Sequence, residues 1–294
     1  MAVNTACPSC NNEENETFKK WAMHAPESDV LRCRRCRLVF LWPRPSKDQL
    51  SDYYAGDYRE VYDSDKSVAL RFREDTEEAN ERVSRLQDLI APGGQVLEIG
   101  SGSGAFLASV KPHAGAVLGV ELDVKSRAWI RDGLGISVVQ TLDEVPRGED
   151  GLDLIAMFHV LEHLPDPKGF LVSLADRLAP GGKIVIEVPN VDDVLVSTYA
   201  VQNFMDSYFT AAHLYYYAPS TLSDVIQESG LKADVQCVQR YDLSNHLRWL
   251  ETGDPGGQGY YSGFLSSVTT ETYAEDLIRS GKADTLWAVC EKPG

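Results

Sequence analysis

A short stretch near the middle of the chain has the composition of a nucleotide-binding turn. An apolar run at 96–99 leads into the glycines Gly100, Gly102 and Gly104. Glycine lets the backbone turn tightly and approach a ligand without a side chain in between. A helix beginning at Ala105 would point its free N–H groups at the same ligand. The order strand, glycine turn, helix predicts a nucleotide site, although Gly100, Gly102 and Ala105 also satisfy the dinucleotide-binding spacing.

Residues beyond the glycines are expected to complete this site. Glu121 ends a second apolar strand about 20 positions after Gly100, where such folds bind ribose hydroxyls through a carboxylate. Leu142 is expected to lie against an adenine ring. The cofactor-binding residues predicted here are Glu98, Gly100, Ser101, Gly102, Gly104, Glu121, Leu122, Leu142, Phe158 and His159.

Three histidines lie where the chemistry of such a site would need a proton acceptor. His159 and His163 follow the strand expected at 152–158, and His213 lies on the connection after the strand at 184–190. Ligands of open α/β sheets bind beyond the carboxyl ends of the strands, and imidazole suits general-base catalysis near neutral pH. Glu162 could orient its neighbours or bind a divalent ion. The structural alternative for His213 is a loop histidine bonded to the backbone.

Two pairs of cysteines near the N-terminus predict a zinc ribbon. Cys7 and Cys10 form one Cys-x-x-Cys turn, and Cys33 and Cys36 form the other. Two such turns can complete a closed tetrahedral site for a structural Zn²⁺, which would supply folding energy to so small a segment. A pair of redox dithiols is the alternative.

The segment after the ribbon is rich in tyrosine. Tyr58 and Tyr62 lie nearest the main domain, and Tyr62 is a candidate for the substrate pocket, since a phenol can bond a polar substrate. Packing of the ribbon against the main domain is the alternative role. Five arginines around the second cysteine pair could form a solvated rim or capture phosphate: Arg32, Arg34, Arg35, Arg37 and Arg44.

The elements that must position these residues follow an α/β pattern. A charged helix with an apolar stripe is expected over 68–90, and five strand–helix repeats between 96 and 190 favour a parallel sheet. The predicted organisation is a zinc ribbon at 1–45, a tyrosine-rich linker and helix at 46–90, and a main domain at 91–294. Its last strand, near 285–290, is expected to lie antiparallel beside the fifth, with an insertion at about 241–282.

Composition limits the partners of the chain. The 294 residues carry a formal net charge of −16, which argues against a nucleic acid, because phosphate contacts need a basic surface. No apolar run approaches the length of a membrane span, and the N-terminus lacks the apolar core of a signal peptide. We therefore expect a cytoplasmic protein that acts on a small-molecule substrate.

The motifs together resemble the class I S-adenosylmethionine-dependent methyltransferases. The resemblance rests on "LEIGSGSG", "GVELD", "FHVLEHLPDP" and "LAPGGKIVIEVPN", and it covers most of the chain. It implies a Rossmann-like seven-stranded sheet with helices on both faces and S-adenosylmethionine as the cofactor. The cysteine pairs, the tyrosine-rich linker and "AAHLYYY" are similar to the deoxysugar C-methyltransferases. That similarity implies His213 as the base and His163 as a second histidine, with Ala212 where those enzymes carry a glutamate.

The expected function is methylation of a small polar metabolite at carbon or oxygen with a histidine base. A nucleotide-activated sugar or a natural-product intermediate is the substrate class that the resemblance implies. An rRNA or tRNA methyltransferase with RNA contacts from the ribbon is one alternative. An NAD(P)-dependent oxidoreductase is the other, because the glycines and Glu121 fit it too.

Overall fold

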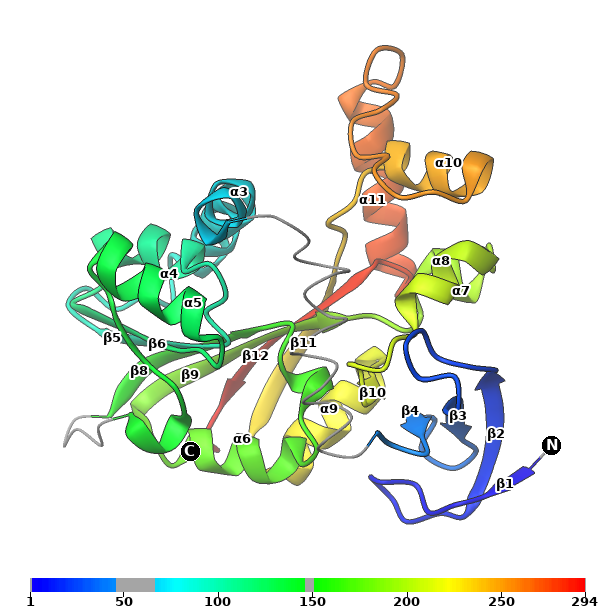
Figure 1. Cartoon of the computed structure of the whole chain (residues 1–294), viewed down its shortest axis with the longest axis horizontal. Coiled ribbons are helices and arrows are strands. Elements are labelled where there is room, and N and C mark those ends of the chain that lie inside the picture. Colours follow the sequence, from blue (N-terminus) through cyan, green and yellow to red (C-terminus); the bar gives the residue numbers. More distant parts are fainter. Residues whose placement is uncertain (1, 46–66, 146–150, 294) are drawn as a thin grey trace.

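Seven strands form the central sheet, in the order β11-β12-β9-β8-β5-β6-β7 (Figure 1). The computed structural model describes residues 2–45, 67–145 and 151–293, so the Tyr62 prediction lies outside the described residues. The strands are β5 (Gln95–Ile99), β6 (Ala116–Val120), β7 (Ser137–Val139), β8 (Leu152–Phe158), β9 (Leu178–Pro189), β11 (Lys232–Val238) and β12 (Thr285–Glu291). Strands β7, β6, β5, β8 and β9 are parallel, and β12 is antiparallel to β9 and to β11. The expected α/β sheet, with its antiparallel last strand beside the fifth, is confirmed.

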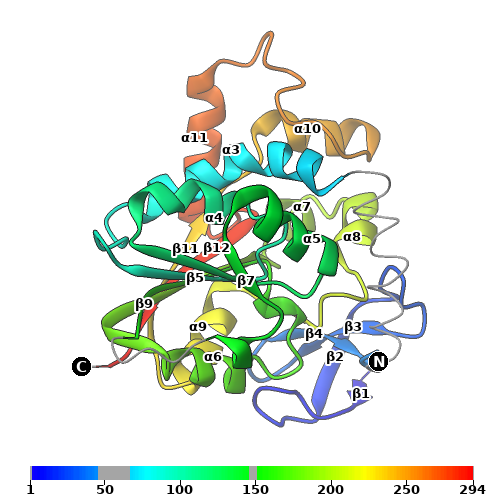
Figure 2. The same ribbon diagram turned by 60° about the vertical axis from the view of Figure 1, so that its left-hand side comes forward.

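Helices cover both faces of this sheet (Figure 2). One face carries α3 (Val68–Leu86), α4 (Ala105–Val110) and α5 (Val124–Ala128), and the other carries α6 (Pro167–Ala175) and α9 (Pro219–Glu228). Short turns of helix join the strands: η1 (Lys111–His113), η2 (Trp129–Gly133), η3 (Leu142–Glu144) and η4 (Leu161–His163). The side chains between sheet and helices form separate cores on the two faces.

Helix α3 packs on the sheet through the apolar stripe expected from its sequence. Ala79, Val83 and Leu86 are buried, and Ile90, just past the end of the helix, is buried as well. Burial of each larger aliphatic side chain contributes about 1.5–3 kcal/mol, so this stripe holds the helix over the sheet. The opposite face of α3 is charged and exposed.

The N-terminal module is a small antiparallel sheet that extends into the main domain. Its strands are β1 (Ala2–Asn4), β2 (Glu14–Lys19), β3 (Asp29–Cys33), β4 (Val39–Trp42) and, from the main domain, β10 (Tyr215–Tyr216). Tyr215 pairs with Phe40 and Tyr216 with Val39. The final strand of the module therefore comes from the segment that carries His213.

Further backbone hydrogen bonds join the module to that segment. Leu41 N donates to Leu214 O at 3.1 Å, and Ala211 N donates to Met23 O at 2.8 Å. Met23 N donates in turn to Phe209 O at 2.7 Å. The buried side chains of the two parts form one shared core.

The remaining helices lie beyond the carboxyl ends of the parallel strands. After β9 the chain forms α7 (Val194–Ser197) and α8 (Gln202–Tyr208). Helices α10 (Leu243–Thr252) and α11 (Ser267–Ser280) lie between β11 and β12, and they project away from the sheet (Figure 1). Among the described residues, no helix has the length and apolar character needed to cross a membrane.

Candidate active site

The glycine turn between β5 and α4 presents open backbone at the carboxyl end of the sheet. Gly102 has a left-handed φ of +52°, and a Cβ placed on it would meet no atom within 4 Å. At Gly100 the corresponding Cβ would lie 2.6 Å from Val160 Cγ2, so packing forbids a side chain there. Gly102 thus offers the open approach that a ligand requires.

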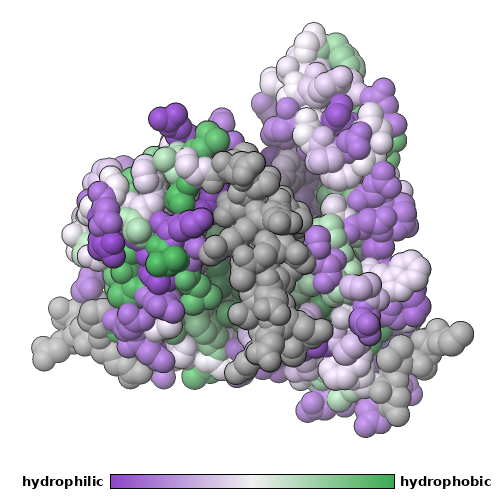
Figure 3. Space-filling view, in the orientation of Figure 1, coloured by the Kyte–Doolittle hydropathy of each residue, from purple (hydrophilic) through white to green (hydrophobic). Residues whose placement is uncertain are grey.

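Glu121 at the end of β6 is folded onto this turn. Its Oε2 accepts a hydrogen bond from Gly102 N, and its Oε1 accepts one from Asp123 N, both at 2.7 Å. Each oxygen keeps a further lone pair that could accept from a hydroxyl group. The neighbouring Leu122 is 75% exposed, and hydrophobic side chains gather near α5 on the face shown in Figure 3. This apolar surface is suited to the base of a nucleotide.

The other predicted cofactor residues differ in exposure. Ser101 is buried, and its hydroxyl donates to Glu98 O at 3.3 Å. Glu98 is buried too, and burial raises its pKa well above the ordinary value. Leu142 lies on η3 and is half-buried. Phe158 packs within the α3-side core, with its ring 4.9 Å from that of Phe106.

An ion-pair cluster lies next to His159, between α3 and the sheet. Arg82 forms two hydrogen bonds with the Glu187 carboxylate, at 3.0 and 2.7 Å. Arg240, which follows β11, contacts the same carboxylate at 3.5 Å and pairs with Glu78 of α3. The cluster therefore ties α3, β9 and the segment after β11 together at the carboxyl end of the sheet. Sequence reasoning missed it, although Glu187 stands out as a charge inside an apolar strand.

His159 is positively charged at neutral pH in this setting. Its Nε2 lies 2.9 Å from Glu187 Oε1 and 2.7 Å from Arg240 Nη1. Arg240 can only donate, so its contact opposes a proton on Nε2, whereas the Glu187 carboxylate favours one. Burial lowers the pKa of His159, but hydrogen bonds to Glu162 and Glu187 outweigh burial and raise the pKa to about 9.

His163 and His213 come together on the ribbon side of the site. Their rings meet edge to face, with centroids 4.8 Å apart. His163 Nδ1 donates to Ala212 O at 3.0 Å, and Leu214 N donates to Glu162 O at 2.9 Å. These two hydrogen bonds join η4 to the segment before β10, so the fold itself creates the histidine pair.

Both imidazoles of the pair are neutral at physiological pH. Burial lowers the pKa of His163, and burial together with the charge of His163 lowers the pKa of His213 to about 3. His213 Nδ1 is buried and has no hydrogen-bond partner among the described residues. The pair therefore has the protonation state that a proton acceptor needs.

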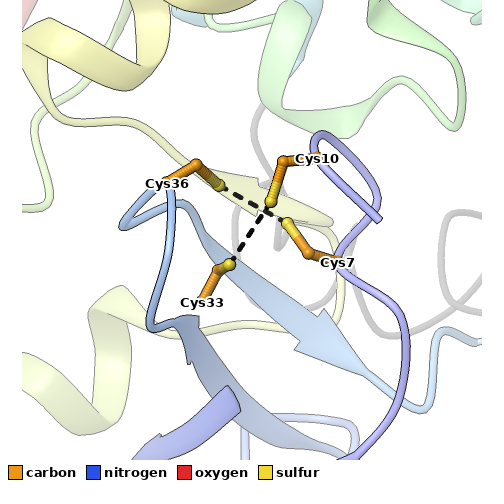
Figure 4. Close-up of side chains that lie close together, drawn as sticks. All are labelled: Cys7, Cys10, Cys33 and Cys36. Carbon is orange, nitrogen blue, oxygen red and sulfur yellow. Dashed lines mark hydrogen bonds between the residues drawn. The ribbon is translucent and has the colours of Figure 1, made fainter. Parts of the chain in front are cut away.

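The four ribbon cysteines converge from their two turns (Figure 4). Sγ of Cys7 lies 3.6 Å from that of Cys36, and the same distance separates Cys10 from Cys33. All four sulfur atoms lie within 4.8 Å of one another. A tetrahedral zinc–thiolate site has Zn–S distances of about 2.3 Å, which places its sulfurs about 3.8 Å apart. The cluster fits a closed zinc site.

The arginines near the ribbon mostly contact the protein itself. Arg34 and Arg37 pair with Glu16 at 3.6 and 3.8 Å, and Arg44 donates to Tyr215 Oη at 2.7 Å. A cavity of about 190 Å³ lies between the ribbon and helices α6 and α9, and Arg44 lines it. This cavity borders Tyr215 and lies apart from the glycine turn.

Comparisons with known proteins agree with this architecture. Residues 70–236 match the family model of a methyltransferase domain. The ubiquinone biosynthesis O-methyltransferase of Coxiella burnetii is 24% identical over 173 residues, covering 55% of this chain and 74% of that protein. The C-methyltransferase NovU of Streptomyces niveus is 27% identical over 210 residues, covering 69% of this chain but only 46% of that protein.

The solved structures show the same fold. An S-adenosylmethionine-dependent methyltransferase from Archaeoglobus fulgidus superimposes with a TM-score of 0.53 at 20% identity. The match covers 82% of this chain and all of that structure.

Proposed function

The chain belongs to the class I S-adenosylmethionine-dependent methyltransferases, and from that premise we propose that it methylates a small polar metabolite with an imidazole as the base. The substrate class that we propose is a nucleotide-activated sugar or a natural-product intermediate, methylated at carbon or oxygen. The family match decides against the oxidoreductase alternative. The observation that carries the proposal is the neutral His163–His213 pair at the carboxyl end of the sheet.

In this proposal the glycine turn and Glu121 bind the cofactor. S-adenosylmethionine supplies the methyl group, so the protein has mainly to align donor and acceptor for in-line displacement. The predicted cofactor residues from Glu98 to His159 come from the carboxyl ends of β5, β6 and β8 and from η3 after β7. Leu122 is the exposed apolar residue among them.

His213 is the proposed general base, and His163 orients the substrate. The tautomer of His163 is fixed by its Nδ1 hydrogen bond to Ala212 O, so its Nε2 carries the lone pair in the neutral ring. His213 offers a buried nitrogen without a protein partner, which favours proton acceptance from a bound acceptor. The similarity to the C-methyltransferase NovU supports methylation at carbon.

The four cysteines are proposed to hold one structural zinc ion. A four-thiolate site leaves no open position, so the ion would supply folding energy to the ribbon. The close sulfur packing shown in Figure 4 supports this assignment.

A panel of acceptors with methyl-labelled S-adenosylmethionine tests the substrate class. The panel contains nucleoside-diphosphate keto-sugars, hydroxylated aromatic natural products, a ubiquinone precursor and total tRNA and rRNA. We expect label in one of the first two groups. Label in RNA alone would contradict the proposal, and it would support the RNA methyltransferase alternative, which the arginines near the ribbon suggest.

A further inference from the structure

Glu162 is a buried carboxylate. Side-chain packing alone does not explain why a charged group lies at this position. Its side chain is 1% exposed, and the ionisable group nearest to its Oε1 is the Nδ1 atom of His159, 3.5 Å away. A carboxylate taken out of water is strongly destabilising unless donors or positive charges compensate it. Its backbone oxygen already holds the turn to Leu214, so the side chain is not needed for that contact.

Three imidazoles surround this carboxylate. Glu162 Oε1 lies 3.5 Å from His159 Nδ1 and 4.0 Å from His163 Nε2. Glu162, His163 and His213 each offer one atom to a cluster in which all three atoms lie within 4.8 Å of one another. Glu162 thus stands between the charged histidine beside the ion-pair cluster and the neutral pair on the ribbon side.

The cluster on the ribbon side brings a carboxylate close to two imidazoles. His163 Nδ1 uses its proton in the bond to Ala212 O, so Nε2, the nitrogen nearer Glu162, carries a lone pair. Nδ1 of His213 is buried without a hydrogen-bond partner among the described residues, and Oε1 of Glu162 has only the 3.5 Å contact to His159. A proton that enters the cluster at a ring nitrogen is attracted by the nearby carboxylate.

We propose that Glu162 is the positioning residue that holds the positive charge formed on the His163–His213 pair during methyl transfer. This inference rests on the proposed function. The carboxylate comes from η4, whereas His213 lies on the segment before β10, so two elements far apart in the sequence build one proton-accepting unit.

Methyl transfer moves a positive charge from the cofactor to the histidine pair next to Glu162. The acceptor atom forms a bond to the methyl carbon, and the S–CH₃ bond breaks with its electron pair going to sulfur. The acceptor proton passes to a ring nitrogen of His213. The positive charge of the sulfonium disappears as the positive charge of an imidazolium appears, and the Glu162 carboxylate attracts that new charge across a few ångströms of buried space.

The electrostatics of the surrounding groups agree with this role. Burial lowers the pKa of both His163 and His213, and in each case the charge of Glu162 opposes burial. Burial raises the pKa of Glu162, but its hydrogen bond to His159 and the nearby histidines lower the pKa by more, so the carboxylate is ionised. Among the described residues, the charge of Glu162 also reaches the phenols of Tyr208 and Tyr217, whose pKa values are raised mainly by burial, so both stay neutral.

The first test is a double-mutant cycle on turnover, with the acceptor that the labelled panel identifies. Glu162→Gln keeps the shape and removes the charge, and Glu162→Asp keeps the charge. We expect Glu162→Gln to lower kcat by roughly 10- to 10³-fold at pH 7, the effect of an opposite charge worth about 1–3 pKa units. KM and S-adenosylhomocysteine affinity should stay unchanged, and Glu162→Asp should recover most of the loss.

Because Glu162 acts through His213, adding Glu162→Gln to His213→Ala should cause no further loss. Turnover of Glu162→Gln should also rise between pH 7 and 10, as hydroxide becomes the better proton acceptor. Additive losses in the double variant, or a kcat within a few-fold of the unchanged chain, would overturn the inference.

The second test needs no acceptor, so it separates this inference from the proposed function. Histidine-labelled protein, loaded with zinc and S-adenosylhomocysteine, is titrated by NMR with and without Glu162→Gln. The pKa of His159, about 9 in the unchanged chain, should fall by about 1–3 units, and His163 should show a lowered pKa too. Unchanged titration of all the histidines would overturn the inference. So would a second bound metal ion per chain that Glu162→Gln removes, since a cation would then occupy the cluster.

Discussion

His213 differs from an ordinary histidine because the protein buries it beside a second imidazole. Its sequence context suggests a base with a pKa near 6.5 and a rate that falls as acid protonates it. The structure instead lowers its pKa to about 3, mainly through burial. The nitrogen is therefore free of a proton over the whole physiological range, and protonation of His213 should cause no loss of rate near pH 6.5.

Replacement of His213 by alanine tests the base assignment directly. His213→Ala should lower turnover by roughly 10²–10⁴-fold, the usual contribution of one acid–base group, while leaving S-adenosylhomocysteine affinity intact. His163→Ala should cost less, because that residue is assigned to orientation. His113→Ala, at an exposed position, is the control. Turnover that survives His213→Ala within a few-fold would place the base elsewhere.

Gly102 allows an equally direct test of the cofactor site. Gly102→Val would put a branched side chain at φ +52° into the open space that the cofactor is expected to fill. Gly135 is a matched control, because it too has a left-handed φ, +61°, and open space around its Cβ, but lies before β7. Both variants should lose about 1–2 kcal/mol of stability. By calorimetric titration, only Gly102→Val should lose S-adenosylhomocysteine affinity, by tenfold or more, and equal losses in both would argue against the site.

The sequence predicts the site unevenly at this scale. The glycines and Glu121 are predictable because their spacing reflects a local turn and the end of the next strand. The cluster of Arg82, Glu187 and Arg240 is not, because its members lie on three elements that only the finished sheet brings together. Glu162 and His213 are likewise separated by about 50 positions, and no local pattern pairs them.

At the scale of elements, the ribbon and the histidine segment form one structure. The sequence predicts a zinc ribbon from its four cysteines and a separate main domain, because sequence motifs report only on neighbouring residues. It does not predict β10, a two-residue strand whose pairing with β4 depends on how the two parts meet.

Loss of the zinc should therefore destabilise residues of the main domain as well as the ribbon. Cys33→Ser should abolish the bound zinc, and hydrogen exchange should rise at residues 209–217 as well as in the ribbon, because β4 loses its support. Elemental analysis should find one zinc per unchanged chain, and Cys237→Ser, outside the cluster, should retain it. If Cys33→Ser leaves the hydrogen-exchange protection of residues 209–217 unchanged, the contact between the ribbon and the main domain does not depend on the metal.

At the scale of the whole molecule, buried histidines make folding sensitive to acid. Burial lowers the pKa of His213 to about 3 and that of His246 to about 4, whereas both titrate near 6.5 when unfolded. The unfolded chain then binds more protons at these two sites, so their contribution to stability is complete above pH 6.5 and falls as pH drops through the two native values.

Chemical denaturation at several pH values measures this dependence. The contribution of each of these two histidines to the unfolding free energy should decline below pH 6.5, by up to about 1.4 kcal/mol per pH unit. The decline should be shallower in His213→Ala. An identical slope in that variant would mean that His213 titrates alike in the folded and unfolded chain.

Because β10 of the main domain pairs with β4 of the ribbon, the ribbon cannot be exchanged between proteins as a separate unit. A chain cut between 45 and 67 would leave β10 with an unpaired edge and would expose the buried Phe209 and Leu214, a combination that promotes aggregation. A ribbon transplanted from a relative would need its own version of residues 209–217 to pair with. The smallest module that could be exchanged therefore consists of two separate segments of the sequence, the ribbon and residues 209–217. The proposed acceptor-binding residue His213 belongs to this module and not to the cofactor-binding part of the chain.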